Sequence, residues 1–186
     1  MDTVAFIRMA DGTREEYAFL GGLWTEHHRK TLADNVLGLL GRMRGPSLGY
    51  KIDRYRHSLQ TATRALRDEA DEETVVCALL HDIGDVLAPG NHSELAAAVL
   101  RPYVSERNHW VVKHHGIFQG YYFWHHLGRD RNARERYRGH PCFAACAEFC
   151  ERWDQTSFDP DYDTLPLSAF EPMVRRVLAR EPRGFD

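Results

Sequence analysis

The segment "ALLHDIGDVL", residues 78 to 87, carries ionisable side chains inside an apolar run. His81 and Asp82 stand side by side, and a second acid, Asp85, follows about one helical turn later. Burying such groups without partners costs several kcal/mol. The pattern therefore predicts that a compensating partner lies against His81 and Asp82 in the folded chain.

A metal is the partner that the other histidines indicate. Histidines recur on successive segments, with His57 before His81 and with His92 and His115 after it, and Asp154 follows in "CERWDQ". Helical bundles build metal centres by bringing a histidine or carboxylate from each of several helices to one point. Imidazole and carboxylate ligands without thiolate suit iron or manganese. Because a carboxylate has two oxygens, Asp82 can bridge two cations while His81 binds only one.

His114 and His115 compete for one place in this arrangement. Neighbouring residues on a helix point about 100° apart, so only one of the two can face the site. We favour His115, which directly precedes Gly116.

The segments that must position these side chains are predicted to be helices, because their apolar residues recur at helical spacing. "APGN" breaks the chain, and Asn91 is the expected N-cap of the helix that follows. Alternation with a period of two is scarce, so we predict an all-α fold in a single domain over residues 1–186. The expected helices cover residues 27–45, 53–68, 71–87, 91–104, 105–116, 117–128, 129–139, 141–155 and 165–180.

Composition excludes several classes of protein. A chain of 186 residues with 43% hydrophobic residues suits one compact domain, and its formal charge of −3 argues against a nucleic-acid surface or a polybasic membrane binder. No stretch approaches the roughly 20 apolar residues of a membrane span, and the acidic start does not resemble a signal peptide. We expect a cytoplasmic protein that acts on a small molecule, in an oligomeric state that the sequence leaves open.

The cysteines are expected to be reduced and mostly buried. Cys142, Cys146 and Cys150 recur at spacing four, which places them along one helix face, and Cys77 lies in an apolar segment. Cysteines along one face of a single helix cannot link distant segments by disulfides. A straight helix also presents at most two neighbouring thiolates to a metal. We therefore interpret these residues as core thiols.

His57, the pair His81 and Asp82, and Asp154 together resemble the four-ligand signature of the HD domain of His-Asp phosphohydrolases. The resemblance covers roughly residues 50–155 and implies an HD-domain helical bundle with a metal-binding core. The residues before and after it are then helical additions.

His92 and His115 make the chain similar to one branch, the HD-domain mixed-valent diiron oxygenases, which include myo-inositol oxygenase and the hydroxyphosphonate oxygenases. Among these, the oxygenase that acts on 1-hydroxy-2-(trimethylammonio)ethylphosphonate resembles the chain most, through segments such as "VVCALLHDIGD" and "HHGIFQGYYF". The resemblance implies two iron ions, Fe(II) and Fe(III), with O2 as co-substrate. One ion would be held by His57, His81, Asp82 and Asp154, and the other by His92, His115 and the shared Asp82.

The implied reaction is oxidative cleavage of a C–P bond, which yields a carboxylate such as glycine betaine together with phosphate. Asp82 and Tyr50 are the catalytic candidates, because phosphonate relatives use a tyrosine upstream of the first histidine to cap the open iron. Asp85 stands where relatives carry lysine or histidine, and a carboxylate there would attract a cation. Aromatic faces with a carboxylate hold quaternary ammonium groups, and the substrate-binding candidates are Asp85, Arg54, Lys113, Gln119, Tyr122 and His125.

Two alternatives share the same ligands. A metal-dependent HD phosphohydrolase acting on a nucleotide or phosphate monoester would use the metals to activate water instead of O2. A catalytically silent metal-binding module would need no substrate. The six ligands, and the absence of basic residues around "HDIGD", favour the oxygenase.

Overall fold

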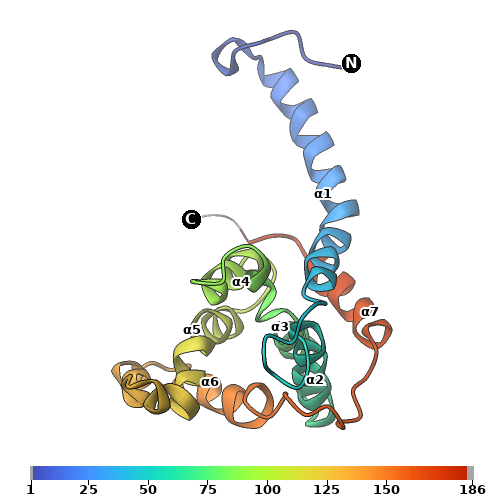
Figure 1. The fold of residues 1–186 in the computed structure, drawn as a ribbon. Helices are drawn as coiled ribbons and strands as arrows, with labels where there is room; N and C mark the ends of the chain where they lie inside the picture. The colour runs from blue at the N-terminus through green and yellow to red at the C-terminus, as the bar shows by residue number, and fades with distance from the viewer. Residues whose placement is uncertain (1, 184–186) are drawn as a thin grey trace.

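The computed structural model describes residues 2–183, which form helices and loops with no strand among them, so the all-α prediction is confirmed (Figure 1). Helices α2 and α3 pack together, as do α4 with α5 and α5 with α6, while α7 covers α3 and the C-terminal end of α1. The α-helices are α1 (Arg14–Arg42), α2 (Arg54–Arg67), α3 (Glu72–Leu80), α4 (His92–Leu100), α5 (Glu106–Phe123), α6 (Phe143–Phe149) and α7 (Leu167–Leu178).

Short helices of other types complete the chain. Four are 3-10 helices, namely η1 (Met9–Asp11), η2 (Ile83–Val86), η3 (Trp124–Leu127) and η4 (Arg131–Tyr137). The fifth, η5 (Cys150–Asp154), is a π-helix that continues α6. Within residues 2–183 no helix is both long and apolar enough to cross a membrane.

Side-chain caps fix where several helices begin. Asp53, Asp71 and Ser105 each accept a hydrogen bond from the backbone N–H three residues later, at the starts of α2, α3 and α5. Such a cap satisfies one of the backbone donors that the first helical turn leaves free. The predicted starts of these three helices agree with the structure to within a residue or two. Asn91, in contrast, occupies the N-cap position of α4 without a side-chain hydrogen bond to the helix.

Helix α1 is longer than the sequence pattern predicts. It begins at Arg14 rather than near residue 27, because Thr13 and Glu16 form a reciprocal capping box. The Glu16 carboxylate also accepts a hydrogen bond from the backbone of Ala5, at 2.7 Å. In the half of α1 before residue 31 the apolar residues are interrupted by Gly21 and Gly22, which are poor helix formers, and this part was not predicted to be helical.

The predicted helix 71–87 is interrupted at His81. Helix α3 ends at Leu80, and the chain turns into η2. Gly84 lies so close to the backbone of His92 that an added Cβ would stand 2.1 Å from the His92 carbonyl oxygen. The close contact between η2 and α4 therefore requires glycine at this position, and it brings Asp82 toward the first residue of α4.

Helix α5, in contrast, runs through the point at which a break was predicted. Gly116 does not end it, because this glycine faces α4, where an added Cβ would lie 2.9 Å from Ser93 Oγ. The residue serves close packing of two helices rather than a turn. The predicted helix 129–139 is a 3-10 helix, and 141–155 divides into α6 and η5.

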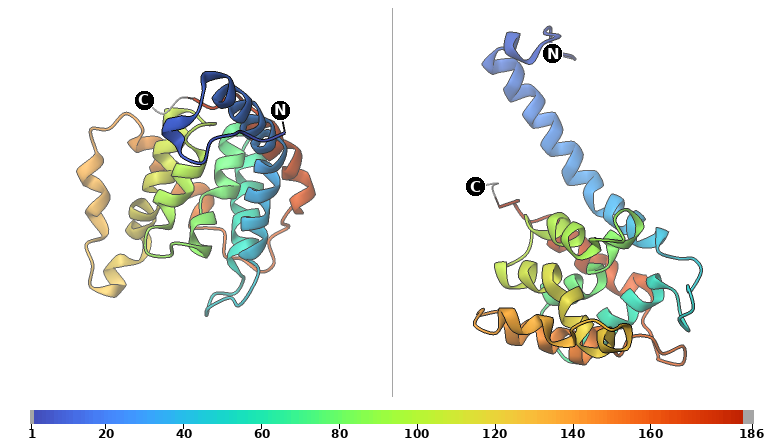
Figure 2. Two further views of the ribbon diagram at one scale, coloured as in Figure 1. Left: turned by 90° about the horizontal axis from the view of Figure 1, so that it is seen from above. Right: turned by 60° about the vertical axis from the view of Figure 1, so that its left-hand side comes forward.

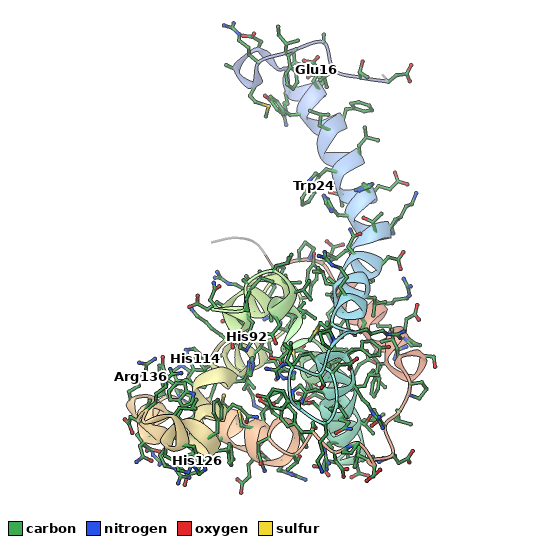
Figure 3. All side chains as sticks on the ribbon, viewed as in Figure 1. Glu16, Trp24, His92, His114, His126 and Arg136 are labelled. Carbon is green, nitrogen blue, oxygen red and sulfur yellow. The ribbon has the colours of Figure 1, made fainter. Side chains whose placement is uncertain are left out.

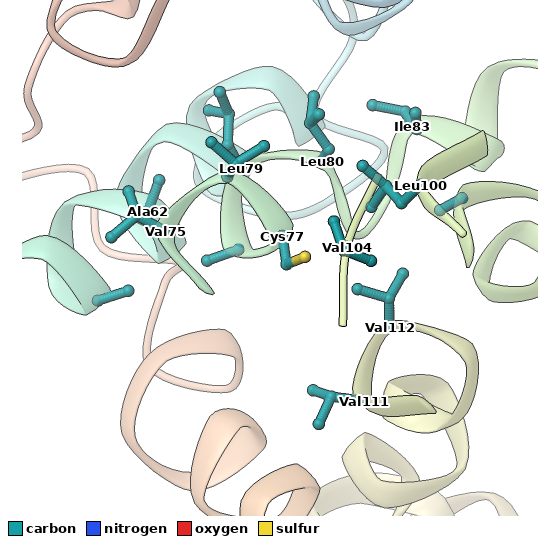
Figure 4. Packing of buried hydrophobic residues seen from close by; sticks show 14 of the residues in the cluster. Ala62, Val75, Cys77, Leu79, Leu80, Ile83, Leu100, Val104, Val111 and Val112 are labelled. Carbon is teal, nitrogen blue, oxygen red and sulfur yellow. The ribbon is translucent and has the colours of Figure 1, made fainter. Parts of the chain in front are cut away.

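One buried cluster joins these elements (Figure 4). Leu79, Leu80, Leu100 and Val112 are fully buried in it. Cys77 is buried in the same cluster, and all four cysteines are free thiols. The Cys146 and Cys150 thiols lie against backbone carbonyl oxygens of α5, at 3.6 and 3.5 Å. Asp154 lies at the end of η5, which continues α6. The two thiol contacts therefore help to set the position of Asp154 along α5.

Glu73 on α3 yields a prediction about acid stability. Partial burial opposes its ionisation, but hydrogen bonds from Ser105, Arg180 and Asn108 outweigh burial and lower its pKa to about 2. Since the folded pKa lies below the unfolded one, the stabilisation is present above about pH 4.5 and disappears as the pH falls toward 2. We expect Glu73→Gln to lower the free energy of unfolding by about 1–3 kcal/mol at pH 7.

Urea unfolding at several pH values tests this expectation. The difference between the wild type and Glu73→Gln should shrink steadily between about pH 5 and pH 2. Glu94→Gln, at an exposed position on α4, is the control that should match the wild type throughout. A difference that stays constant with pH would show that the carboxylate charge contributes nothing.

Candidate metal centre

Six side chains from five parts of the chain converge at the centre of the bundle. All are buried except His92, whose side chain is one-quarter exposed. They are His57 on α2, His81 and Asp82 directly after α3, His92 at the start of α4, His115 on α5 and Asp154 at the end of η5.

Four of these residues surround one point. His57 Nε2 lies 3.2 Å from Asp154 Oδ1 and 3.6 Å from Asp82 Oδ2. His81 Nε2 lies 3.4 Å from Asp82 Oδ2 and 3.7 Å from Asp154 Oδ1, and the two imidazole Nε2 atoms are 3.3 Å apart. Atoms that bind one divalent ion at about 2.1 Å lie about 3.0–3.4 Å from each other. The four atoms are therefore spaced as the ligands of a single cation, and we call this point the first metal position.

Backbone hydrogen bonds orient the imidazoles. His57 Nδ1 lies 2.8 Å from the Ser157 carbonyl oxygen, and His81 Nδ1 lies 2.8 Å from that of Ala78. A carbonyl oxygen can only accept, so each Nδ1 is the donor and each neutral ring directs the lone pair of Nε2 inward. Metal-binding histidines are commonly held in this way.

Asp154 gives an independent indication that a cation belongs here. Its Oδ2 atom is buried and has no hydrogen-bond partner among the described residues. A buried carboxylate oxygen without a partner carries a large desolvation cost. A divalent ion beside Oδ1 and Oδ2 would offset that cost, so the residues present fit a metal.

Asp82 directs its other oxygen to a second point. Its Oδ1 atom lies 3.1 Å from His115 Nε2 and 3.3 Å from His92 Nε2. His115 Nδ1 donates to the Val112 carbonyl oxygen at 2.7 Å, which directs Nε2 toward Asp82. The carboxylate of Asp82 thus stands between two clusters, and we call the point beside His92 and His115 the second metal position.

The histidines and carboxylates at the centre shift one another's pKa values. Burial alone would lower the pKa of His57 and His81, but the carboxylates of Asp154 and Asp82 outweigh it and raise both values. Burial would likewise raise the pKa of Asp82, and the surrounding imidazoles hold it well below its usual range. Metal binding requires the deprotonated form of each ligand, so bound metal ions would displace any proton that these groups carry.

His114 and His115 have separate surroundings. His115 is buried and faces Asp82, whereas the ring of His114 stacks on Trp110 at 4.1 Å between ring centroids. His114 Nδ1 lies 2.8 Å from the Trp110 carbonyl oxygen. The structure therefore places His115, and not His114, at the second metal position.

Asp85 lies beside the centre, in contact with two of its members. Its Oδ1 atom is 3.3 Å from His92 Nδ1, and its Oδ2 atom is 3.2 Å from Arg54 Nε. Arg54 also approaches Asp82 Oδ2, at 3.4 Å. His92 Nδ1 has the Pro89 carbonyl oxygen as its hydrogen-bond partner, at 3.4 Å, and the Asp85 carboxylate lies close enough to hold the ring by its charge, which leaves Nε2 free for a metal. We therefore reassign Asp85 from substrate binding to orientation of His92 and Arg54.

Replacing Asp85 with asparagine is expected to weaken metal binding at the second position by about 10- to 100-fold. The amide keeps the shape of the side chain, but it loses the charge that orients the His92 ring. Competition titration with a metal-binding dye should show an unchanged first binding step and a weakened second one. Glu94→Gln on the same helix should leave both steps unchanged, and equal affinities in Asp85→Asn and the wild type would contradict this assignment.

A cavity of about 350 Å³ opens onto the centre. Asp82, His92, His115 and Asp154 line its floor. Four residues predicted from the sequence also line it, namely Tyr50, Arg54, Gln119 and Tyr122. Three further lining residues were not predicted, namely Phe123, Gln155 and Phe158.

Tyr50 reaches this cavity from the loop before α2. Its ring stacks on Phe158 at 5.0 Å between centroids, and Phe158 stacks on His57 at 4.4 Å. Arg54 lies over the Tyr50 ring at 5.4 Å. Gln119 donates from Nε2 to Asp154 Oδ1 at 3.2 Å, while its buried Oε1 has no partner within residues 2–183.

Lys113 and His125 are not among the residues that line the cavity. Both are exposed. Lys113 precedes His115 by two residues, so the helix directs it about 200° away from the site. His125 lies past the end of α5 on η3, with its ring 3.9 Å from that of His126. The structure therefore does not bring either residue to this cavity.

Phe158 and Gln155 were missed by the sequence analysis. Both follow Asp154 closely, and their approach to the site depends on the π-helix η5. A π-turn rotates each residue less far around the axis than an α-helical turn does, and such turns are frequent at functional sites. Sequence periodicity gives no signal for it, although the short distance from Asp154 would have been a reason to consider both residues.

Comparison with known proteins agrees with this geometry. The family model described as the HD domain matches residues 54–157, which run from the start of α2 to just beyond Asp154 and include all six converging residues. A search of curated proteins finds no significant match. The matched segment covers more than half of the chain, and the two His/Asp groups His57, His81, Asp154 and His81, Asp82, His115 have the spacing to hold metal ions. The chain therefore belongs to the HD domain family, whose members are generally metal-dependent enzymes.

Proposed function

We propose that this protein is a non-haem diiron oxygenase that cleaves the C–P bond of a 1-hydroxy-2-(trimethylammonio)ethylphosphonate or a similar amino compound. The products would be glycine betaine or a related carboxylate, and phosphate. One O2 supplies both oxygen atoms that the products gain, so the reaction needs no external reductant.

The placement of Asp82 between two clusters is the observation that carries this proposal. One oxygen faces His57 and His81, and the other faces His92 and His115. A mononuclear HD enzyme needs only the first of these clusters. The second cluster supplies fewer protein ligands, and it borders the cavity, where a substrate has access to it.

The chemistry of the ligands supports iron. Imidazole and carboxylate ligands suit iron among the common redox metals, and no thiol lies among the six converging residues. Two iron ions at these positions would supply Lewis acidity toward a hydroxyl and phosphonate oxygen, together with activation of O2.

The protein's own residues would bind and orient the substrate. Arg54 on α2 and Gln119 on α5 both line the cavity and offer N–H donors to a phosphonate from two different helices. Tyr50, Phe158 and Tyr122 present aromatic side chains to the same space, and aromatic faces attract a quaternary ammonium group without a hydrogen bond. A zwitterion, whose anionic end can meet the N–H donors and whose cationic end can meet the aromatic side chains, fits this cavity better than a sugar does.

The direct test begins with protein purified anaerobically in the presence of Fe(II) and then partly oxidised with a limited amount of O2, so that one of the two iron ions becomes Fe(III). We expect a mixed-valent EPR signal that changes when 1-hydroxy-2-(trimethylammonio)ethylphosphonate is added. Exposure to air should then consume one O2 for each phosphate released. His115→Ala should lose this activity, while the matched neighbour His114→Ala should retain it.

The metal-dependent HD phosphohydrolase remains the second candidate, because it would use the same ligands. It predicts release of phosphate from a nucleotide or phosphate monoester in the presence of manganese, with no O2 uptake on any hydroxyphosphonate. That result would overturn the oxygenase proposal and leave the metal centre itself in place.

A further inference from the structure

The N-terminal part of α1 extends away from the rest of the protein (Figures 1 and 2). From Leu32 onward the helix packs on the core through Leu32, Val36 and Leu40. Residues 14–30, which we call the arm, contain one buried residue, Glu16, whose carboxylate is used by the capping box at the tip. Figure 3 shows Trp24 and Glu16 on this projecting part.

The arm exposes large apolar side chains along one face. Tyr17 precedes Leu20 and Gly21 by three and four residues, and Trp24 follows Gly21 and Leu20 by three and four, which places all four on one side of a helix. The indole of Trp24 is 64% exposed and Leu23 is 50% exposed. An apolar groove runs along this face and is lined chiefly by Met9, Tyr17, Leu20, Leu23 and Trp24. Apolar surface of this extent on a projecting helix is typical of an interaction site.

Two glycines in the middle of the arm point to the kind of contact. Gly21 and Gly22 each cost a helix about 1 kcal/mol relative to alanine, and a free helix of this length is marginal in water. An added Cβ at either glycine would meet no atom within 4 Å, so nothing in the described chain uses their small size. A second helix crossing over Gly21 would use it, because glycine allows close approach of two helix backbones.

We propose that the groove is occupied by the arm of a second copy of this chain, lying antiparallel to the first. The arm is self-complementary, because Gly21 and Trp24 lie one turn apart on the same face. In an antiparallel pair each Trp24 can cover the Gly21 of the other copy, and both contacts form at once. This is the isologous arrangement that a two-fold dimer requires.

The distribution of charge along the arm also favours an antiparallel pair. The beginning of the arm, residues 14–16, carries Arg14, Glu15 and Glu16 and hence a net charge of −1, and its end, residues 26–30, carries Glu26, Arg29 and Lys30 and hence a net charge of +1. An antiparallel pair sets the acidic end of one arm beside the basic end of the other, whereas a parallel pair sets like charges together. Glu16 is engaged in the capping box and Lys30 pairs with Glu26 at 2.6 Å, so this preference comes from the net charges of the two arm ends and not from specific ion pairs. Antiparallel helix dipoles add to the preference.

The available surface is adequate for a weak to moderate dimer. Trp24, which is 64% exposed, contributes most, since an aromatic side chain covers roughly 150–250 Å² when fully buried, whereas Tyr17 is 36% exposed and adds correspondingly less. Leu20, Leu23 and the exposed Met9 extend the contact toward the roughly 800 Å² per partner of a standard interface. The arm lies away from the metal centre, so dimerisation and metal binding are separable.

Sedimentation velocity of the full chain, at concentrations from 1 to 100 micromolar as a rough range for such an interface, tests the proposal. We expect a species of twice the 21.5 kDa chain mass. Trp24→Glu and Gly21→Glu should each give the mass of one chain, with unchanged metal content and unchanged far-UV circular dichroism. The control Leu127→Glu, at a residue 63% exposed on η3, should remain a dimer. A wild-type monomer at all concentrations, or arm variants that stay dimeric, would overturn the proposal.

Cysteine cross-linking tests the orientation. Leu23 lies near the expected two-fold axis, so Leu23→Cys should form a disulfide-linked dimer under mild oxidation. In an antiparallel pair Tyr17 lies far from the Tyr17 of the other copy, so Tyr17→Cys should remain unlinked. Equal cross-linking at both positions would indicate parallel arms and contradict the antiparallel arrangement. The wild type, which has no cysteine in the arm, is the background control.

Discussion

Replacing Asp82 with asparagine is expected to lower oxygenase turnover by on the order of 10³-fold, because metal ligation contributes several kcal/mol to the reaction. Asp82 offers one oxygen to each cluster. Asparagine has the same shape, but its amide nitrogen carries two protons and cannot bind a cation. The metal position that faces the amide nitrogen therefore loses a ligand. The other position keeps an oxygen ligand but loses the negative charge of the Asp82 carboxylate.

Metal analysis should accompany the activity measurement. We expect Asp82→Asn to retain fewer than two metal ions per chain after gel filtration, while the wild type retains two. Asp53→Asn is the matched control, since Asp53 caps α2 at the edge of the same region and asparagine caps a helix equally well. Two retained metal ions and turnover within about tenfold of the wild type would show that Asp82 does not bridge.

Phe149→Ala is expected to produce the largest loss of stability, about 3–5 kcal/mol. The ring is almost fully buried and packs edge-on against His81, at 5.6 Å between centroids, and against His115, at 6.4 Å. Its removal leaves a void beneath two imidazoles of the metal centre. A chain of this size should then unfold at a temperature lower by roughly 6–20 °C.

Thermal unfolding in the presence of a chelator isolates this effect from metal binding. Phe149→Leu should lose less than half as much stability, because it refills most of the void. Leu87→Ala, at an exposed position after η2, should match the wild type. A loss below about 1 kcal/mol in Phe149→Ala would mean that the surroundings collapse onto the space and that the ring is not needed to support the centre.

The helical segments that carry the ligands could be predicted because local rules determine them. Apolar spacing and the caps at Asp53, Asp71 and Ser105 depend only on nearby residues. The break after Leu80 could not be predicted in this way, since it depends on the contact of Gly84 with α4. For the same reason Gly116 was interpreted as a helix end, although it is a contact point between two helices.

The ligand side chains were easier to identify than the side chains around the cavity. A buried His-Asp pair requires a partner wherever it lies, so the need for a metal could be inferred from residue type. The environment of Asp85 depends on Arg54, which lies 31 positions earlier, and on the first residue of α4. Its charge was therefore assigned to the substrate before the structure showed two nearer partners.

The most direct test of the central claim is a crystal structure of the iron-loaded protein, with anomalous diffraction collected at the iron absorption edge. Two peaks about 3.5–4 Å apart, one on each side of the Asp82 carboxylate, are expected. The first should lie among His57, His81 and Asp154, and the second between His92 and His115. A single peak among the first three residues, with His92 and His115 free of metal, would contradict a shared dinuclear centre.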